Sequence, residues 1–258
     1  VDGLNIYGPA TDLVRVNPQN GIDLFSQSRN EAVNYIEYLT YITRSSCAPK
    51  PIHTVIDVGN DPPVFEDSAP TPEEITLQTF MALAYGSKGI LFRRVPGLHE
   101  GKTVDENEIE LKKEVLETID KLTEWITANS QLIYNSVPLT HIYQRDTKVE
   151  TASLISGDSK LVIFVLNHDN TSRLENKNKQ NKETVAFIPK KDLKLEIPLP
   201  DGKIIENVTE IYPGSEHEMN IINEKDLQYI VIDKLAVGKV LVGDLKDKPL
   251  EKEEPEKE

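Results

Sequence analysis

Residues Pro70–Arg94, PTPEEITLQTFMALAYGSKGILFRR, decide the fold class of this chain. Thr71 can cap a helix whose first position is Pro72, and the two glutamates that follow favour the N-terminal end of that helix. The next residues recur at helical spacing and predict one buried stripe, formed by Ile75, Thr79, Phe80, Leu83 and Ala84. Gly86 fits the end of the helix, and Gly89–Phe92 has the composition of a short buried strand. The segment therefore predicts a helix that leads into a parallel strand.

The rest of the first half repeats this alternation of strands and helices. Leu4–Tyr7 and Ile52–Val58 read as strands, while Asn30–Arg44 and Glu106–Ile133 have helical periodicity. Such alternation is typical of a parallel sheet with right-handed crossovers. A closed (β/α) barrel needs eight strands, so three strands in residues 1–135 predict only part of a barrel.

The second half changes to short β-rich runs. Nine such runs predict an antiparallel β-sandwich over residues 136–245: Thr140–Tyr143, Ala152–Ile155, Leu161–Leu166, Thr184–Ile188, Leu193–Ile197, Val208–Ile211, Met219–Ile222, Gln228–Ile232 and Val240–Val242. The polar stretch Asn170–Lys182 reads as a mobile hairpin tip. Residues 246–258 are charged and spaced by proline, which predicts a disordered tail.

Composition limits the classes of partner. A net charge of −14 argues against nucleic acid, and no apolar run is long enough to predict a membrane span. The single cysteine, Cys47, excludes an internal disulfide. No phosphate-binding loop or zinc pattern occurs, so we expect neither a cofactor nor a metal site. Val1 directly precedes an apolar run, which suggests a segment of a longer protein.

Three segments carry a resemblance to a known group of enzymes. ALAYGSKGILFRR (Ala82–Arg94) resembles the last helix–strand step of TIM-barrel glycoside hydrolases of the β-galactosidase type. VDGLNIYGP (Val1–Pro9) is similar to a strand end two steps earlier, and PIHTVIDVGND (Pro51–Asp61) to the strand that carries the nucleophile. The resemblance implies the last three β/α units of a barrel followed by a β-sandwich. It also implies a carbohydrate ligand, hydrolysis of a glycosidic bond, and remaining barrel strands supplied by a preceding segment or another chain.

The resemblance assigns roles to residues at the strand ends. Asp57 stands where these hydrolases place a glutamate nucleophile, although aspartate is one methylene shorter. Its alternative roles are a structural acceptor that caps the following loop and a substrate-binding residue. Arg93 matches a strand-end position and would bind sugar hydroxyls or pair with a carboxylate. Tyr7 resembles a tyrosine that lines the sugar site, with packing at the barrel rim as its alternative. Asn60 and Asp61 lie in the loop after Asp57 and would reach the substrate.

Two other functions stay open. The absence of a strand-end glutamate favours an inactive relative that binds carbohydrate or serves as a structural surface module. A different barrel enzyme, such as a sugar lyase or isomerase, is the second alternative. The sequence leaves the compartment open, and secretion or display at the cell surface is an expectation only.

Overall fold

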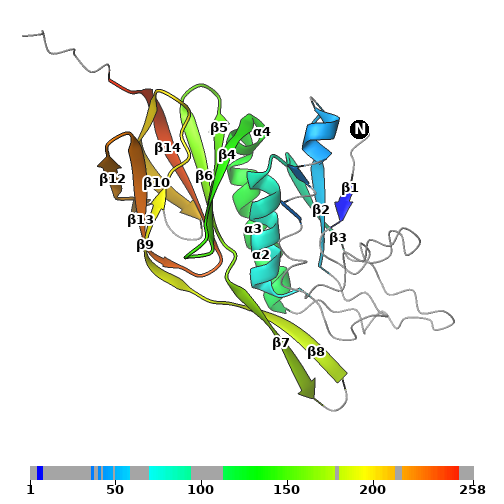
Figure 1. The fold of residues 1–258 in the computed structure, drawn as a ribbon. Coiled ribbons are helices and arrows are strands. Elements are labelled where there is room, and N and C mark those ends of the chain that lie inside the picture. The colour runs from blue at the N-terminus through cyan, green and yellow to red at the C-terminus, as the bar shows by residue number, and fades with distance from the viewer. Residues whose placement is uncertain are drawn as a thin grey trace, which may run out of the picture.

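The computed structural model describes residues 5–7, 36–37, 40–41, 43–48, 50–58, 70–93, 113–177, 180–212 and 217–249; for residues 5–7, 57, 172–177 and 180–184 it describes the backbone. These residues form layers that follow one another across the molecule (Figure 1). A small parallel sheet comes first, then two long helices, and then antiparallel sheets. The chain therefore has an α/β N-terminal part followed by a β-rich part.

The first layer is the predicted parallel sheet. It contains β1 (Asn5–Tyr7), β2 (His53–Asp57) and β3 (Gly89–Arg93), paired in parallel in the order β1-β2-β3. Residues 36–37, 40–41 and 43–47 are helical and fall within or next to the predicted helix Asn30–Arg44. Both the identity of the three strands and their parallel pairing are as the alternating pattern predicts.

Helix α2 (Pro72–Ala84) begins and ends where its sequence signals predict. The Thr71 hydroxyl accepts a hydrogen bond from the Glu74 backbone N–H at 3.2 Å, and the Glu74 carboxylate accepts one from the Thr71 N–H at 2.7 Å. This reciprocal arrangement is a capping box, which satisfies two N–H groups at the start of the helix. At the other end, Gly86 has a φ of 102° and donates its N–H to the Leu83 carbonyl. Glycine takes this left-handed conformation without the steric cost that a side chain would add.

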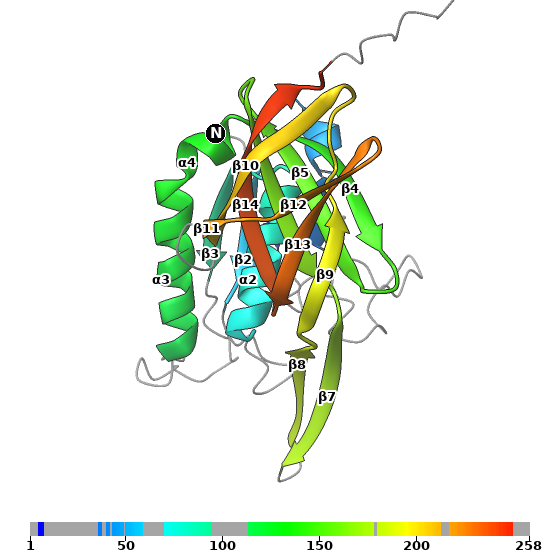
Figure 2. The same ribbon diagram turned by 90° about the vertical axis from the view of Figure 1, so that its left-hand side faces the viewer.

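The burial of α2 differs from the predicted single stripe. Every residue from Glu74 to Ala84 is buried, including Leu77 and Met81, which lie outside the stripe. The reason is that α2 lies between two sheets and also packs against helix α3 (Figures 1 and 2). A helix covered on all sides buries its whole circumference, so the periodicity marks only one of its contact faces.

The long helix predicted for Glu106–Ile133 is interrupted. The structure has α3 (Lys113–Ala128) and a short α4 (Ser130–Tyr134), and residues 106–112 lie outside the described residues. At the break, the Asn129 side-chain amide donates a hydrogen bond to the Trp125 carbonyl at 2.9 Å. The Asn129 backbone N–H donates to the same carbonyl at 3.0 Å, so the side-chain bond adds to the helical bond and does not replace it.

Antiparallel strands make up the rest of the described chain. They are β4 (Ser136–Gln144), β5 (Val149–Ser156), β6 (Lys160–Asn167), β7 (Asn170–Lys177), β8 (Gln180–Phe187), β9 (Lys190–Glu196), β10 (Lys203–Tyr212), β11 (His217–Glu218), β12 (Ile221–Glu224), β13 (Leu227–Leu235) and β14 (Gly238–Asp247). They form a six-stranded sheet of order β11-β10-β14-β6-β5-β4, a three-stranded sheet of order β12-β13-β9, and the pair β7-β8. Each of the nine predicted runs overlaps a strand.

The structure has the hairpin that the polar stretch Asn170–Lys182 predicts, but most of this stretch, read from sequence as the tip, belongs to the paired strands β7 and β8. The two strands extend away from the other sheets as a long hairpin (Figures 1 and 2). Their backbone groups pair with each other along the whole register, from Asn170–Phe187 to Lys177–Gln180. Backbone pairing of this kind needs no apolar side chains, so the polar composition of the segment gave no signal for strands.

Strand β6 shows how the layers share the core. Val162, Phe164 and Leu166 belong to an apolar cluster with α2, α3 and β2. The alternate residues Leu161, Ile163 and Val165 belong to a second cluster with β9 and β13. Alternate side chains of a strand point to opposite faces, so the six-stranded sheet is buried on both sides. Helix α2 is thereby fixed against the antiparallel sheets as well as against the parallel one.

Candidate functional site

The carboxyl ends of the parallel strands bring two of the predicted site positions together. Asp57 is in register with Arg93 on the neighbouring strand, and the N–H of Val58 donates to the Arg93 carbonyl at 2.9 Å. Tyr7 is in register with Val55, two positions before Asp57. Asn60 and Asp61 lie outside the described residues. The strand-end row formed by Asp57 and Arg93 is thus the part of the predicted site that the structure describes.

The two faces of the parallel sheet have different surroundings. Ile56, Ile90 and Phe92 belong to or pack against the apolar cluster around α2. Leu91 alternates with Ile90 and Phe92 along β3, and it is 58% exposed. The face of β3 that carries Leu91 is therefore exposed at this position, whereas the face that carries Ile90 and Phe92 packs against the apolar cluster.

A second group of polar side chains lies between the α/β part and the six-stranded sheet. Its centre is Glu150 on β5, which is 3% exposed. One oxygen of Glu150, Oε1, accepts hydrogen bonds from the Tyr85 hydroxyl and from His141 Nδ1, both at 2.8 Å. The rings of Tyr85 and His141 stack with centroids 3.9 Å apart. The residue that follows helix α2 and a residue of strand β4 therefore hold one side of this carboxylate.

The other side of Glu150 faces Glu37 and His168. His168 Nε2 lies 3.0 Å from Glu150 Oε2, although the two groups are not aligned as a hydrogen bond. Burial, and next the charge of Glu150, raise the pKa of Glu37 from 4.5 to about 7. Burial also acts to raise the pKa of Glu150, but the hydrogen bond from His141 and the closeness of His168 outweigh it and hold that pKa below its usual value. The two neighbouring carboxyl groups thus differ in their affinity for a proton.

Two tyrosines, Tyr85 and Tyr143, lie next to these carboxylates and histidines. Burial raises the pKa of Tyr85, and the charges of Glu150 and Glu37 raise it further, so its hydroxyl stays a donor. The ring of Tyr143 stands edge-on to that of His168 with centroids 5.6 Å apart. Burial is also the largest influence on the Tyr143 pKa, which it raises. We refer to Glu37, Tyr85, His141, Glu150 and His168 as the carboxylate–histidine cluster.

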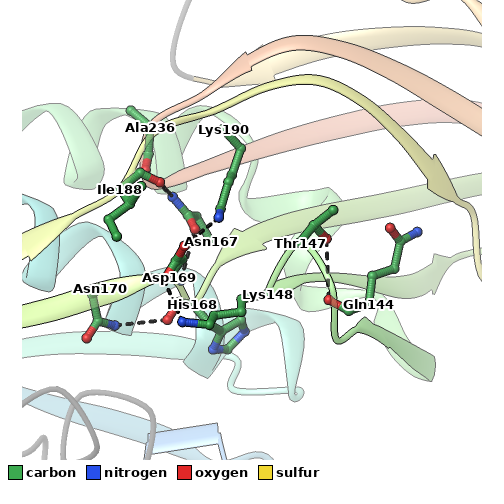
Figure 3. A network of polar contacts seen from close by, with 10 residues as sticks. All are labelled: Gln144, Thr147, Lys148, Asn167, His168, Asp169, Asn170, Ile188, Lys190 and Ala236. Carbon is green, nitrogen blue, oxygen red and sulfur yellow. Dashed lines mark hydrogen bonds and ion pairs between the residues drawn. The ribbon is translucent and has the colours of Figure 1, made fainter.

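A polar network next to His168 fixes the chain after β6 (Figure 3). The amide nitrogen of Asn167 donates to the carbonyls of Ile188, at 3.0 Å, and Ala236, at 2.7 Å, and its Oδ1 accepts from the Asp169 N–H at 3.0 Å. Asp169 in turn pairs with Lys148, at 2.8 Å, and with Lys190. Four connections of the antiparallel region are therefore joined around the residues that flank His168.

We expect Asn167→Ala to lower the free energy of unfolding by about 2–4 kcal/mol. Asn167 is fully buried, and its removal leaves two carbonyls and one N–H without their partner. Each buried polar group left in that state costs about 1–3 kcal/mol. Chemical denaturation of both proteins measures the difference. The exposed Asn135→Ala is the control, with an expected change within about 0.5 kcal/mol, and a loss below about 1 kcal/mol for Asn167→Ala would contradict the prediction.

Sequence reasoning missed the carboxylate–histidine cluster. His141 and His168 looked scattered because no short spacing links them, and neither stands in a zinc-binding pattern. One signal was present: Glu150 interrupts VETASLI, a run that otherwise suits a buried strand. An acid in such a position needs partners, and the structure supplies them from an α-helical segment, α2, β4 and the turn after β6.

Comparison with known proteins identifies similar solved structures but no match by sequence. No family model matches the sequence, and no curated protein matches it. A family 5 glycoside hydrolase from Bacteroides vulgatus shares 12% identity, with a TM-score of 0.48 over 94% of this chain and 49% of that one. An α-L-fucosidase GH29 from Bacteroides thetaiotaomicron shares 9% identity, with a TM-score of 0.42 over 76% of this chain and 38% of that one. The chain thus spans at most about half the length of these two neighbours.

Within the described residues, no helix is both long and apolar enough to cross a membrane.

Proposed function

We propose that this chain is the C-terminal segment of a glycoside hydrolase-like barrel protein that acts on carbohydrate. The observation that carries the proposal is the strand-end row, in which Asp57 and Arg93 are in register at the carboxyl ends of neighbouring parallel strands. Barrel enzymes place their chemistry at this end of the sheet. An aspartate and an arginine at this end of the sheet are residue types that can bind sugar hydroxyls or take part in cleavage of a glycosidic bond.

The proposal includes further strands that complete the barrel. In the described residues, β1 and β3 are the two edge strands of the sheet, and each pairs with β2. Strands from a preceding segment or from another chain would pair with these edges and cover the exposed Leu91. They would also bring the second carboxylate that a retaining glycosidase needs at about 5–5.5 Å from the first.

The alternative function is that of a carbohydrate-binding or structural surface module without activity. One observation favours it: position 57 holds aspartate, where the hydrolases that this sequence resembles have glutamate. Binding of a sugar needs hydrogen-bonding groups and a flat apolar surface but no nucleophile. Sugar binding without turnover by the completed protein would therefore support the alternative and exclude the enzyme.

The experiment compares this chain alone with the polypeptide that joins it to the remaining barrel strands. Both proteins are tested for hydrolysis of a panel of nitrophenyl glycosides and for binding on an oligosaccharide array. We expect the joined polypeptide to bind and cleave at least one sugar and the chain alone to do neither well, because half of the site is absent. Full turnover by the chain alone would contradict the incomplete barrel. If the joined polypeptide neither binds nor cleaves any of these sugars, the proposal that carbohydrate is the ligand is contradicted.

A further inference from the structure

We propose that Glu37, Glu150 and His168 bind one divalent transition-metal ion between the α/β part and the six-stranded sheet. One ligand atom from each of the three side chains lies within 4.8 Å of the other two. Glu37 belongs to a helical segment, Glu150 to β5, and His168 follows β6. The three ligands thus come from parts of the chain that only the fold brings together.

The surroundings of two atoms, one in Glu37 and one in His168, indicate that a ligand binds between these side chains. Glu37 Oε2 and His168 Nε2 are both buried; Glu37 Oε2 has no hydrogen-bond partner, and His168 Nε2 contacts Glu150 Oε2 at 3.0 Å without the alignment of a hydrogen bond. The His168 side chain is 6% exposed. Buried polar atoms are nearly always paired, because an unpaired one loses its hydration and gains nothing in return. A single cation coordinated by both atoms would satisfy them together.

Glu150 is already oriented as a ligand would be. Its Oε1 accepts hydrogen bonds from Tyr85 and His141, each at 2.8 Å, which leaves Oε2 as the oxygen that faces His168. Ligating carboxylates are commonly held in this way by hydrogen bonds from a surrounding layer of side chains. Tyr85 and His141 therefore act as positioning residues, and they do not contact the ion themselves.

The donor set selects the class of ion. Two carboxylates and one imidazole suit Zn²⁺ or Mn²⁺, whereas Ca²⁺ and Mg²⁺ prefer sites made of oxygen ligands alone. A dication would also balance the two negative charges when both carboxylates are ionised, and so remove their repulsion in a buried place. Its structural effect would be to join the helical segment that holds Glu37 to the antiparallel sheets. The site is independent of the strand-end row, since it shares no residue with it.

The test uses the chain freed of metal with a chelator and then dialysed. Zn²⁺ and Mn²⁺ are titrated by calorimetry, and bound metal is counted by mass spectrometry after equilibrium dialysis. We expect one Zn²⁺ per chain, a higher melting temperature in its presence, and no saturable binding of Mg²⁺ or Ca²⁺. Glu37→Gln keeps the size of the side chain, and we expect it to lower Zn²⁺ affinity at least about tenfold and to abolish the thermal shift. His168→Gln should do the same.

Two surface variants control for adventitious binding. Glu206 and His217 have side chains that are 44% and 54% exposed, and Glu206→Gln and His217→Gln should leave Zn²⁺ affinity unchanged. Circular dichroism of each metal-free variant checks that it is folded. If His168→Gln does not fold, Glu37→Gln decides the result alone. Absence of stoichiometric Zn²⁺ and Mn²⁺ binding, or unchanged affinity in the folded Glu37→Gln chain, would overturn the site and leave the proposed sugar chemistry untouched.

Discussion

Phe80→Ala is expected to lower the free energy of unfolding by about 3–5 kcal/mol, the usual cost of removing a fully buried aromatic side chain. Phe80 has no exposed surface and lies in the middle of α2. Its ring contacts those of Trp125, at a centroid distance of 5.6 Å, Phe164, at 5.9 Å, and Tyr212, at 4.8 Å. These partners come from α3, β6 and β10, so the substitution opens a cavity where the helices meet the six-stranded sheet.

The effect of Phe80→Ala should reach both halves of the chain. One apolar cluster includes residues of β2, α2, α3, β5 and β6, which means that the α/β part and the antiparallel sheets share a core. We therefore expect a single unfolding transition that shifts as a whole when followed in turn by far-ultraviolet circular dichroism and by Trp125 fluorescence. Leu116→Ala on α3 is the matched control, because Leu116 is 43% exposed and its loss should cost less than about 1 kcal/mol.

Two outcomes would contradict this view of the core. A loss below about 1.5 kcal/mol for Phe80→Ala would mean that the surrounding rings collapse into the space, contrary to their fixed packing between two layers. Separate transitions for the two spectroscopic probes would mean that the halves unfold independently. A stability of about 5–15 kcal/mol is usual for a folded protein, so the expected loss is a large share of the total.

The second large effect concerns activity and rests on the proposed function. Asp57→Asn in the polypeptide that completes the barrel should lower turnover by several orders of magnitude, because a neutral amide cannot attack to form a glycosyl ester. The melting temperature should change little, since the substitution keeps the size of the side chain. Turnover of a nitrophenyl glycoside and thermal unfolding of the same preparations measure the two quantities.

Asp57→Ala separates catalysis from a structural role. If Asp57 is only a capping acceptor, Asp57→Asn should leave turnover nearly intact, and Asp57→Ala should cost about 1 kcal/mol of stability. Near wild-type turnover in Asp57→Asn would remove the nucleophile assignment. It would not affect the proposal that this end of the sheet binds sugar, because Arg93 stands beside Asp57 in register and could still contact the ligand.

Several features of the fold could be predicted because their causes are local. The limits of α2 follow from Thr71, Glu74 and Gly86, residues that act on backbone groups within four positions of themselves. The three parallel strands and the antiparallel runs follow from apolar patterns that a strand imposes over a few residues. The parallel pairing of β1, β2 and β3 follows from the alternation of strands with helical segments.

The candidate site residues also fall into a group that local sequence could predict and a group that it could not. Asp57 and Arg93 could be paired in advance, because neighbouring parallel strands that both run to the same edge leave their ends side by side. Glu37, Glu150 and His168 could not, because nothing within a few residues of any one of them indicates the other two. Their meeting depends on how the helical segment, β5 and the turn after β6 pack against each other.

The amino-acid sequence by itself determined the local elements of this protein: where α2 starts and stops, which runs are strands, and which ends of the parallel sheet carry charge. Only the tertiary structure decided that α2 is buried all round, that Asn170–Lys177 pairs as a strand, and that two acids and a histidine far apart in the chain share one buried place. The physical reason is the range of the forces involved. Caps, turns and periodicity act over a few residues, whereas burial and buried polar partners depend on contacts between layers that the chain forms only when it folds.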